Sequence, residues 1–154
     1  MKLATLGYIH RDNQTLMLHR TKKENDIHEG KWNGVWGKFD AGETPEECMI
    51  REIEEETGLI ARDPILKGII TAPMFAKWED WYIFVYEIVD FSWELIECSE
   101  WDLEWIDDDR VLWLNLWEWD RYFMEWMQEK KDQIFSGKFV YEDGNLISHT
   151  GVFH

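Results

Sequence analysis

The stretch of residues 37–59, which reads GKFDAGETPEECMIREIEEETGL, constrains the fold more than any other part of the chain. Within it Glu52, Glu55 and Glu56 are spaced i, i+3 and i+4, so an α-helix places all three carboxylates on one face. Like charges at that spacing repel each other by roughly a few tenths of a kcal/mol per pair. The cluster therefore favours a bound divalent cation as counter-charge, with a solvated acidic face as the alternative.

The signals for the two ends of this helix are complete. Thr44 is a natural N-cap, Pro45 occupies the first helical position, and Glu47 completes a Thr-x-x-Glu capping box. Gly58 supplies the left-handed residue that follows the last turn. The sequence thus predicts a helix over residues 45–57. The side chains of its core face are Met49, Ile50, Ile53 and Thr57.

The other apolar segments predict a mixed sheet and a second helix. Apolar residues at i, i+3, i+4, i+7 and i+8 predict a helix over residues 115–130. Residues 21–31 are polar and predict a loop. The predicted strands are 3–10, 15–20, 64–71, 81–90, 103–106, 134–141 and 146–153, with hairpins at each end of the chain. The class is α/β, and the pattern leaves the strand order open.

The net charge of the chain limits which classes of molecule it can bind. Sixteen Lys and Arg against 32 Asp and Glu give a net charge of −16, which repels a polymeric nucleic acid backbone. A small nucleotide remains compatible if metal ions bridge the two negative partners. Because Cys48 and Cys98 form no zinc or disulfide pattern, a reducing cytoplasm fits best. With no signal peptide and no long apolar run, we expect a single domain over residues 1–154, without membrane contact, as a monomer or homodimer.

The acidic stretch follows a strict pattern. Gly37 is followed after five residues by Glu43, and seven residues later comes REIEEETGL. This resembles the Nudix box, Gly-x5-Glu-x7-Arg-Glu-(apolar)-x-Glu-Glu-x-Gly-(apolar), at every fixed position. The resemblance implies a Nudix-like α/β/α sandwich with a mixed β-sheet and a catalytic loop-helix. It also implies a hydrolase of diphosphates linked to another moiety, with Mg²⁺ as cofactor and Mn²⁺ as an alternative.

The resemblance assigns roles within the box. Glu52, Glu55 and Glu56 become metal ligands, one of them or a relayed Glu activates water, and Gly37 lets the backbone approach the metal. Arg51 cannot be a ligand, so we expect it to hold Glu43 or a neighbouring carboxylate. A simple helix pair of Arg51 with Glu47 or Glu55 is the alternative. Outside the box, Glu100, in preference to Glu104, is a candidate for a further metal ligand or the base.

Outside the box, the chain resembles the MutT-type oxidised purine nucleoside triphosphatases, or 8-oxo-dGTP diphosphatases, which implies a role in DNA repair. In that group, residues matching Asn33 and Asp120 read the purine edge and one matching Trp117 stacks on the base. The alternatives are a turn Asn, an acid in the first turn of a helix and a core Trp. Lys23 is a candidate for a phosphate contact, with an exposed loop Lys as the alternative.

Four of the eleven tryptophans depart from the family pattern. Relatives usually carry Gly at the positions of Trp36, Trp93, Trp101 and Trp119. Any of these that needs φ > 0 would be strained, and Trp119 would crowd a base pocket beside Asp120. Either the tryptophans are genuine and reshape the pocket, or the gene comes from an organism that reads UGA as Gly.

Three functions remain open at this stage. The first is a Mg²⁺-dependent pyrophosphohydrolase that converts a purine nucleoside triphosphate, oxidised or ordinary, to monophosphate and pyrophosphate. The second is a Nudix hydrolase of another nucleoside diphosphate derivative, such as ADP-ribose or a dinucleotide. The third is a catalytically silent Nudix domain that senses nucleotides; the complete carboxylate set argues against it.

Overall fold

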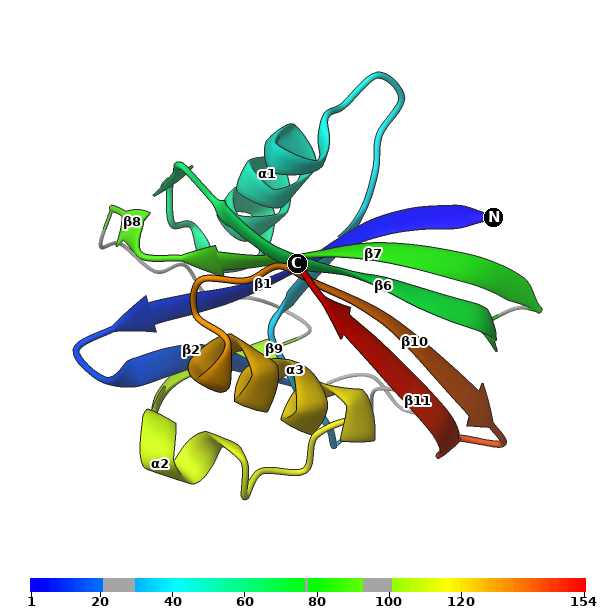
Figure 1. The fold of residues 1–154 in the computed structure, drawn as a ribbon. Coiled ribbons are helices and arrows are strands. Elements are labelled where there is room, and N and C mark those ends of the chain that lie inside the picture. Colours follow the sequence, from blue (N-terminus) through cyan, green and yellow to red (C-terminus); the bar gives the residue numbers. More distant parts are fainter. Residues whose placement is uncertain (21–29, 77, 93–100) are drawn as a thin grey trace.

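A computed structural model of the chain describes residues 1–20, 30–76, 78–92 and 101–154. The helix over residues 45–57 and a second long helix lie on opposite faces of one mixed sheet (Figure 1). The helices are α1 (Pro45–Thr57), α2 (Asp108–Val111) and α3 (Glu118–Glu129). The strands are β1 (Lys2–Arg11), β2 (Gln14–Arg20), β3 (Trp32–Asn33), β4 (Val35–Lys38), β5 (Ala61–Arg62), β6 (Ile65–Ala76), β7 (Glu79–Ile88), β8 (Asp90–Phe91), β9 (Trp101–Asp107), β10 (Phe135–Glu142) and β11 (Asn145–Phe153).

The sheet runs in the order β11-β10-β6-β7-β1-β2-β3, with β4 on β1 and β9 on β2. The β1–β7 and β6–β10 pairs are parallel and the other pairs are antiparallel, so the predicted mixed sheet is confirmed. A separate two-stranded sheet joins β5 to β8. The parallel β1–β7 pair puts β1 at the centre, where both of its faces are covered.

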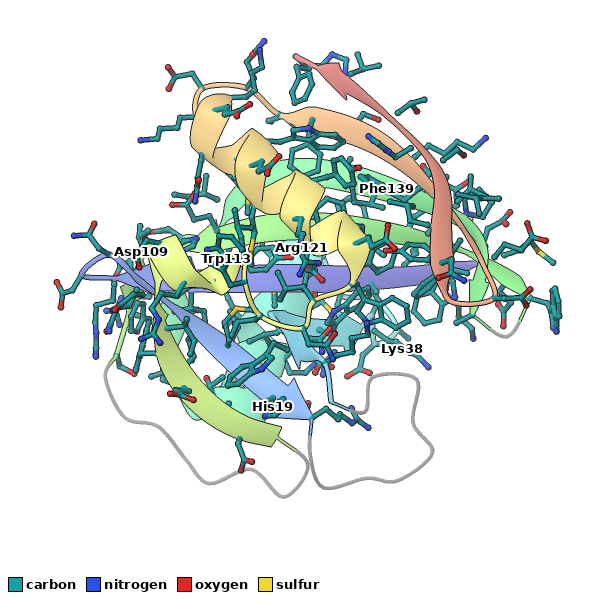
Figure 2. The ribbon with its side chains drawn as sticks, turned by 90° about the horizontal axis from the view of Figure 1, so that it is seen from below. His19, Lys38, Asp109, Trp113, Arg121 and Phe139 are labelled. Carbon is teal, nitrogen blue, oxygen red and sulfur yellow. The ribbon has the colours of Figure 1, made fainter. Side chains whose placement is uncertain are left out.

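The two faces of β1 serve two cores. Ile9 faces α1 and packs in a cluster with Met49 and Ile53. Leu6 and Tyr8 face the other way, in a cluster that includes residues of α3. Phe139 of β10 belongs to this second core, where its ring centroid lies 5.0 Å from that of Phe123 on α3 (Figure 2). Alternation along β1 therefore fixes which helix lies on which side.

Both predicted terminal hairpins, the helix over residues 45–57 and the strand over 103–106 are confirmed. The second helix begins at Glu118, three residues later than predicted. The reason is Asn115, whose backbone carbonyl accepts from Trp32 N–H at 2.9 Å and whose side-chain amide donates to Gly30 O at 2.9 Å. Those bonds tie Asn115 to the entrance of β3 instead of to a helical turn. Strands β3, β4, β5 and β8 are too short for periodicity to reveal.

Among the described residues, no helix is both long enough and apolar enough to cross a lipid bilayer.

Candidate active site

The capping geometry sets the register of α1 as the sequence predicts. Thr44 Oγ1 accepts a hydrogen bond from Glu47 N–H at 3.1 Å, and Pro45 opens the helix. At the other end Gly58 has φ of 79° and donates its N–H to Glu54 O at 2.9 Å. The apolar side of α1 is buried against the sheet. The exposed Glu55 and the partly exposed Glu52 and Glu56 lie outside this buried side, where they can contact a ligand.

Arg51 is the centre of the acidic cluster. Its guanidinium donates from Nε and Nη2 to the two carboxylate oxygens of Glu43, at 2.7 and 2.9 Å. Its Nη1 reaches Glu52 at 2.8 Å and Glu55 at 3.2 Å, and its Nη2 also donates to Lys38 O at 2.9 Å. The expected Glu43 partner and the alternative i+4 pair with Glu55 thus both occur.

The pKa values of two glutamates in the cluster shift in opposite directions. The hydrogen bonds from Arg51, with one from the Asp40 backbone N–H, lower the pKa of Glu43 to about 2. Burial raises the pKa of Glu52, although Arg51 acts in the other direction. Glu43 is therefore a fixed anion that anchors the loop before α1 to Arg51.

Gly37 lies directly against Glu52. A Cβ at position 37 would stand 1.8 Å from Glu52 Cγ and 2.2 Å from its Cδ, so no other residue fits without displacing that carboxylate. The backbone thus approaches the carboxylate closely, as expected. Carboxylate and carbonyl oxygens at one place are the hard donors that Mg²⁺ prefers, so the residues fit that ion chemically.

In the described parts of the chain, no three acidic, Cys or His side chains converge on one point that could hold a metal. Glu52 and Glu55 instead turn toward Arg51, which neutralises part of their charge. Glu100 lies outside the described residues. Glu104 is exposed on β9, opposite Met17 of β2.

The two residues predicted to read a base are both fully buried. Asn33 is 0% exposed, and neither atom of its side-chain amide has a hydrogen-bond partner among the described residues. Asp120, in the first turn of α3, accepts a short hydrogen bond from Tyr8 through Oδ1, while its Oδ2 has no such partner within the described residues. Burial raises the pKa of Asp120 to about 7, against the opposing effects of Tyr8, Arg121 and Lys31.

Tyr8 is the hydrogen-bond partner of Asp120, and no pattern in the sequence points to it. Its hydroxyl donates to Asp120, and its ring lies 3.0 Å from where a Cβ on Gly34, the neighbour of Asn33, would stand. A tyrosine inside an apolar strand is usually a core residue. Only the tertiary contact with α3 distinguishes it here.

Trp117 immediately precedes α3 and is 6% exposed. The ammonium of Lys31 lies 5.0 Å from its ring centroid, and the rings of Phe75 and Tyr141 meet it edge-on at 5.7 and 5.6 Å. The predicted stacking platform is therefore covered by its own neighbours. Lys23, the predicted phosphate contact, lies outside the described residues.

The structure describes the side chains of two of the four tryptophans that depart from the family pattern. Trp36 is in strand β4 and Trp119 in helix α3, so neither needs φ > 0 and the conditional strain does not arise there. Their rings stack with centroids 5.7 Å apart. Trp93 and the side chain of Trp101 lie outside the described residues.

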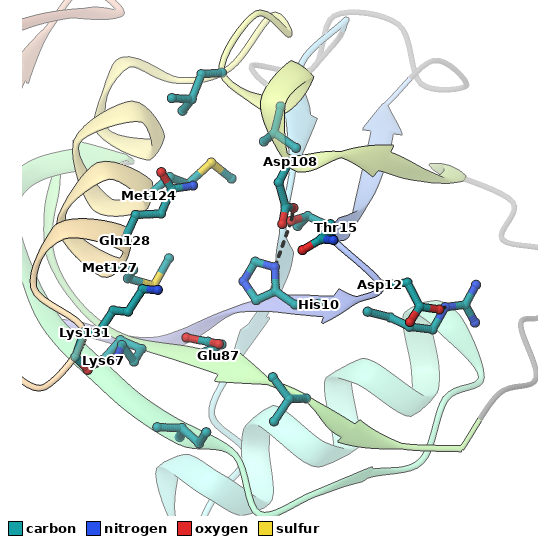
Figure 3. A pocket seen from close by; sticks show the side chains of 16 residues that line it. His10, Asp12, Thr15, Lys67, Glu87, Asp108, Met124, Met127, Gln128 and Lys131 are labelled. Atoms are coloured by element: carbon teal, nitrogen blue, oxygen red, sulfur yellow. Dashed lines mark hydrogen bonds and ion pairs between the residues drawn. The ribbon is translucent and has the colours of Figure 1, made fainter.

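A pocket of about 610 Å³ lies elsewhere, between β1, α2 and the C-terminal half of α3 (Figure 3). Its polar network joins His10 Nδ1 to Thr15 Oγ1 at 2.8 Å, and Thr15 Oγ1 donates to Asp108 at 2.7 Å. Burial lowers the pKa of His10, against Glu87 and Asp108. None of the predicted site residues lines this pocket, so it is separate from the acidic face of α1.

Comparison with known proteins agrees with this arrangement. Residues 2–127 match the family described as NUDIX domain. The oxidized purine nucleoside triphosphate hydrolase of Danio rerio is 28% identical over 146 residues, which cover 95% of this chain and 90% of that protein. The crystal structure of the MutT protein from Bacillus halodurans superposes with a TM-score of 0.85 at 28% identity, covering 98% of this chain and 97% of that one. A shorter match, 38% identical over 71 residues, covers 46% of this chain and 40% of the ADP-ribose pyrophosphatase of Methanocaldococcus jannaschii.

Proposed function

The chain belongs to the NUDIX family of hydrolases that act on pyrophosphate bonds, and on that premise we propose that its substrate is a purine nucleoside triphosphate. The base is ordinary or oxidised, as in 8-oxo-dGTP, and the products are the monophosphate and pyrophosphate. The observation that carries the purine assignment is the burial of Asn33 and Asp120: neither atom of the Asn33 amide, nor Oδ2 of Asp120, has a hydrogen-bond partner in the described part of the chain. Such groups are costly to bury unless a ligand satisfies them.

The acidic face of α1 would hold the cofactor. We assign Glu52, Glu55 and Glu56, with Gly37 and Glu100, to a Mg²⁺ site that Mn²⁺ can also fill. A bound Mg²⁺ supplies charge neutralisation at the phosphate oxygens and a more acidic water. Arg51 keeps Glu43 and the helix carboxylates in place, and one of the glutamates takes the proton of the attacking water.

The base site would use two complementary groups. The Asn33 amide offers a donor and an acceptor, and Asp120 with its raised pKa offers a carboxyl that can carry a proton near pH 7. Together they can pair with a purine edge that presents both kinds of group. Trp117 would then stack on the base, which is worth roughly 1–3 kcal/mol, and Lys23 would contact phosphate.

A substrate panel tests this assignment. We would measure product formation from GTP, ATP, dGTP, 8-oxo-dGTP, ADP-ribose and a dinucleotide with Mg²⁺, with the Glu55→Gln variant as control. We expect purine triphosphates to give monophosphate and pyrophosphate, and Glu55→Gln to lose turnover while its circular dichroism stays unchanged. Full activity in that variant would contradict the metal assignment.

A second candidate function is hydrolysis of ADP-ribose. It is supported by the 71-residue match to the ADP-ribose pyrophosphatase of Methanocaldococcus jannaschii. Preference for ADP-ribose in the panel would select it. Activity on none of the compounds would favour the nucleotide sensor. A single domain over residues 1–154, a cytoplasmic location, a role in DNA repair and a monomeric or homodimeric state stay predictions.

A further inference from the structure

We propose that Trp36 and Trp119 determine base specificity by occupying the space beside Asp120 that a purine would fill. Removing the two indoles would open that space to a purine base. The inference rests on the proposed function in one respect, because it takes Asn33 and Asp120 as the base-reading groups.

The position of Trp119 is the first argument. It lies in the first turn of α3, it is 0% exposed, and its indole N–H has no acceptor among the described residues. Its ring is surrounded by other aromatic rings. The centroid distances are 4.5 Å to Phe75, 5.2 Å to Tyr141, 5.7 Å to Trp36, 5.8 Å to Phe123 and 6.4 Å to Trp117. A flat heteroaromatic group enclosed in this way has the surroundings that a nucleobase would need.

The polar groups next to Trp119 are the second argument. Asp120 follows it directly in the chain and accepts a hydrogen bond from Tyr8, whose ring lies 3.0 Å from where a Cβ on Gly34 would stand. An indole has one N–H donor and no acceptor, so it cannot satisfy an amide and a carboxyl together. A purine edge carries both donors and acceptors. The aromatic enclosure is therefore occupied by a side chain that gives no hydrogen bond to Asp120 Oδ2, which has no partner within the described residues.

Trp36, on β4, fills the space next to the Trp119 ring. It packs against the core on the α3 side and stacks on Trp119 with an interplanar angle of 28°. With both indoles in place, the rings around Trp117 stay in contact with each other, and a base can stack on Trp117 only after Trp119 moves. Helix α1 packs on the other face of the sheet, but Trp36 directly precedes Gly37, which lies against Glu52, so hydrolysis is measured apart from base binding.

The test compares Trp119→Gly and the double variant Trp36→Gly/Trp119→Gly with the unaltered chain. A matched control is Trp126→Gly, which removes the same side chain two turns further along α3, next to Phe135 and Phe153. We would measure binding of GMP, CMP and indole by calorimetry and by the shift in melting temperature, without added metal. Circular dichroism verifies folding. Trp119→Ala, which removes the indole without placing glycine in α3, serves if the glycine variants do not fold.

We expect the double variant to bind GMP at least tenfold more tightly than the unaltered chain does, and more tightly than it binds CMP. We expect Trp126→Gly to gain no GMP affinity, although its cavity can accept indole. Equal GMP affinity in all proteins would overturn the proposal. So would a double variant that binds indole but does not prefer GMP to CMP, because that result describes a nonspecific cavity.

Hydrolysis is measured separately, so the two proposals can fail independently. If the double variant binds GMP but no protein cleaves any nucleotide, the proposed reaction is wrong and the specificity role stands. If the unaltered chain cleaves purine triphosphates with the same kcat/KM as the double variant, and GMP affinity is equal, the specificity role is wrong and the reaction stands.

Discussion

Arg51 holds Glu43 through two parallel hydrogen bonds, from Nε to Oε2 at 2.7 Å and from Nη2 to Oε1 at 2.9 Å. Glu43 in turn accepts from the Asp40 backbone N–H at 2.7 Å. This chain of contacts fastens the loop after β4 to the middle of α1. The planar fork of a guanidinium is needed for it, because a lysine ammonium cannot make the same paired geometry.

We therefore expect Arg51→Lys to lower kcat by about 10- to 100-fold, the usual cost of losing a group that orients metal ligands. KM for the nucleotide should change little, since Arg51 donates to Glu43, Glu52 and Glu55 and not to Asn33 or Asp120. Steady-state kinetics with a Mg²⁺ titration measures both. The control is Arg62→Lys, because Arg62 pairs with Asp90 in an exposed bridge and should be neutral. An Arg51→Lys enzyme as active as the Arg62→Lys enzyme would refute the anchoring role.

Gly37→Ala should displace Glu52, because the new Cβ would lie 1.8 Å from Glu52 Cγ. We expect loss of Mg²⁺-dependent activity with little change in circular dichroism. Gly42→Ala is the contrasting control, since nothing lies within 4 Å of its added Cβ but its φ is 80°. That variant should lose stability through backbone strain and keep its metal dependence. If both variants behave alike, steric contact with Glu52 is not the cause.

Asp120 should make stability depend on pH. Its pKa is about 7 in the folded protein against 3.8 for the free side chain, so the folded state holds the proton more tightly than the unfolded state. The stabilisation from this group is complete below pH 4 and is lost as the pH rises to 7. The free energy of unfolding should fall over that range by about 4 kcal/mol from this residue.

Asp120→Asn removes that titration. Between pH 4 and 7 the free energy of unfolding of the variant should therefore rise relative to that of the unaltered chain. Denaturant titrations at several pH values measure the difference, in which the contributions of other groups cancel. If the two curves run parallel, Asp120 does not titrate as described. For the unaltered enzyme, KM for purine triphosphates should also rise above pH 7, because the protonated carboxyl is then lost.

Local signals were enough to predict α1 and its carboxylates. Thr44, Pro45 and Gly58 fix the ends of the helix from sequence neighbours alone, and the spacing of Glu52 and Glu55 then follows from helix geometry. The same reasoning placed the terminal hairpins, where alternation is strong.

Contacts between distant segments were not predictable in this way. Asn115 delays the start of α3 because it bonds to Gly30, and Tyr8 reaches Asp120 from 112 residues away. No spacing rule connects such pairs. The aromatic enclosure of Trp119 depends likewise on rings from β4, β6 and β10, which are brought together only by the sheet order.

Among the tryptophans of the described residues, Trp78 has the strained backbone. Its φ is 58°, in the left-handed region that favours glycine, and its side chain is 83% exposed, so little packing offsets the strain. We expect Trp78→Gly to raise the free energy of unfolding by up to about 1 kcal/mol, because relief of the left-handed strain exceeds the entropy cost of glycine. Trp113, which is 87% exposed without a positive φ, is the matched control. Trp113→Gly should give no gain, and equal effects of the two substitutions would contradict the strain argument.

Trp78 also bears on how the gene is read in its natural host. A tryptophan in a conformation suited to glycine, together with Trp119 in a site that its polar neighbours do not match, is what results if glycine codons are translated as Trp. If the gene comes from an organism that reads UGA as Gly, protein isolated from the native host carries Gly at positions 36, 93, 101 and 119, and also at position 78. Intact-mass and peptide mass spectrometry would show a protein lighter by one indole side chain at each. Protein made from the same gene in a host that reads UGA as Trp is the reference. Identical masses from the two sources would establish that the tryptophans are genuine, and the closed base site would then be the natural state of this enzyme.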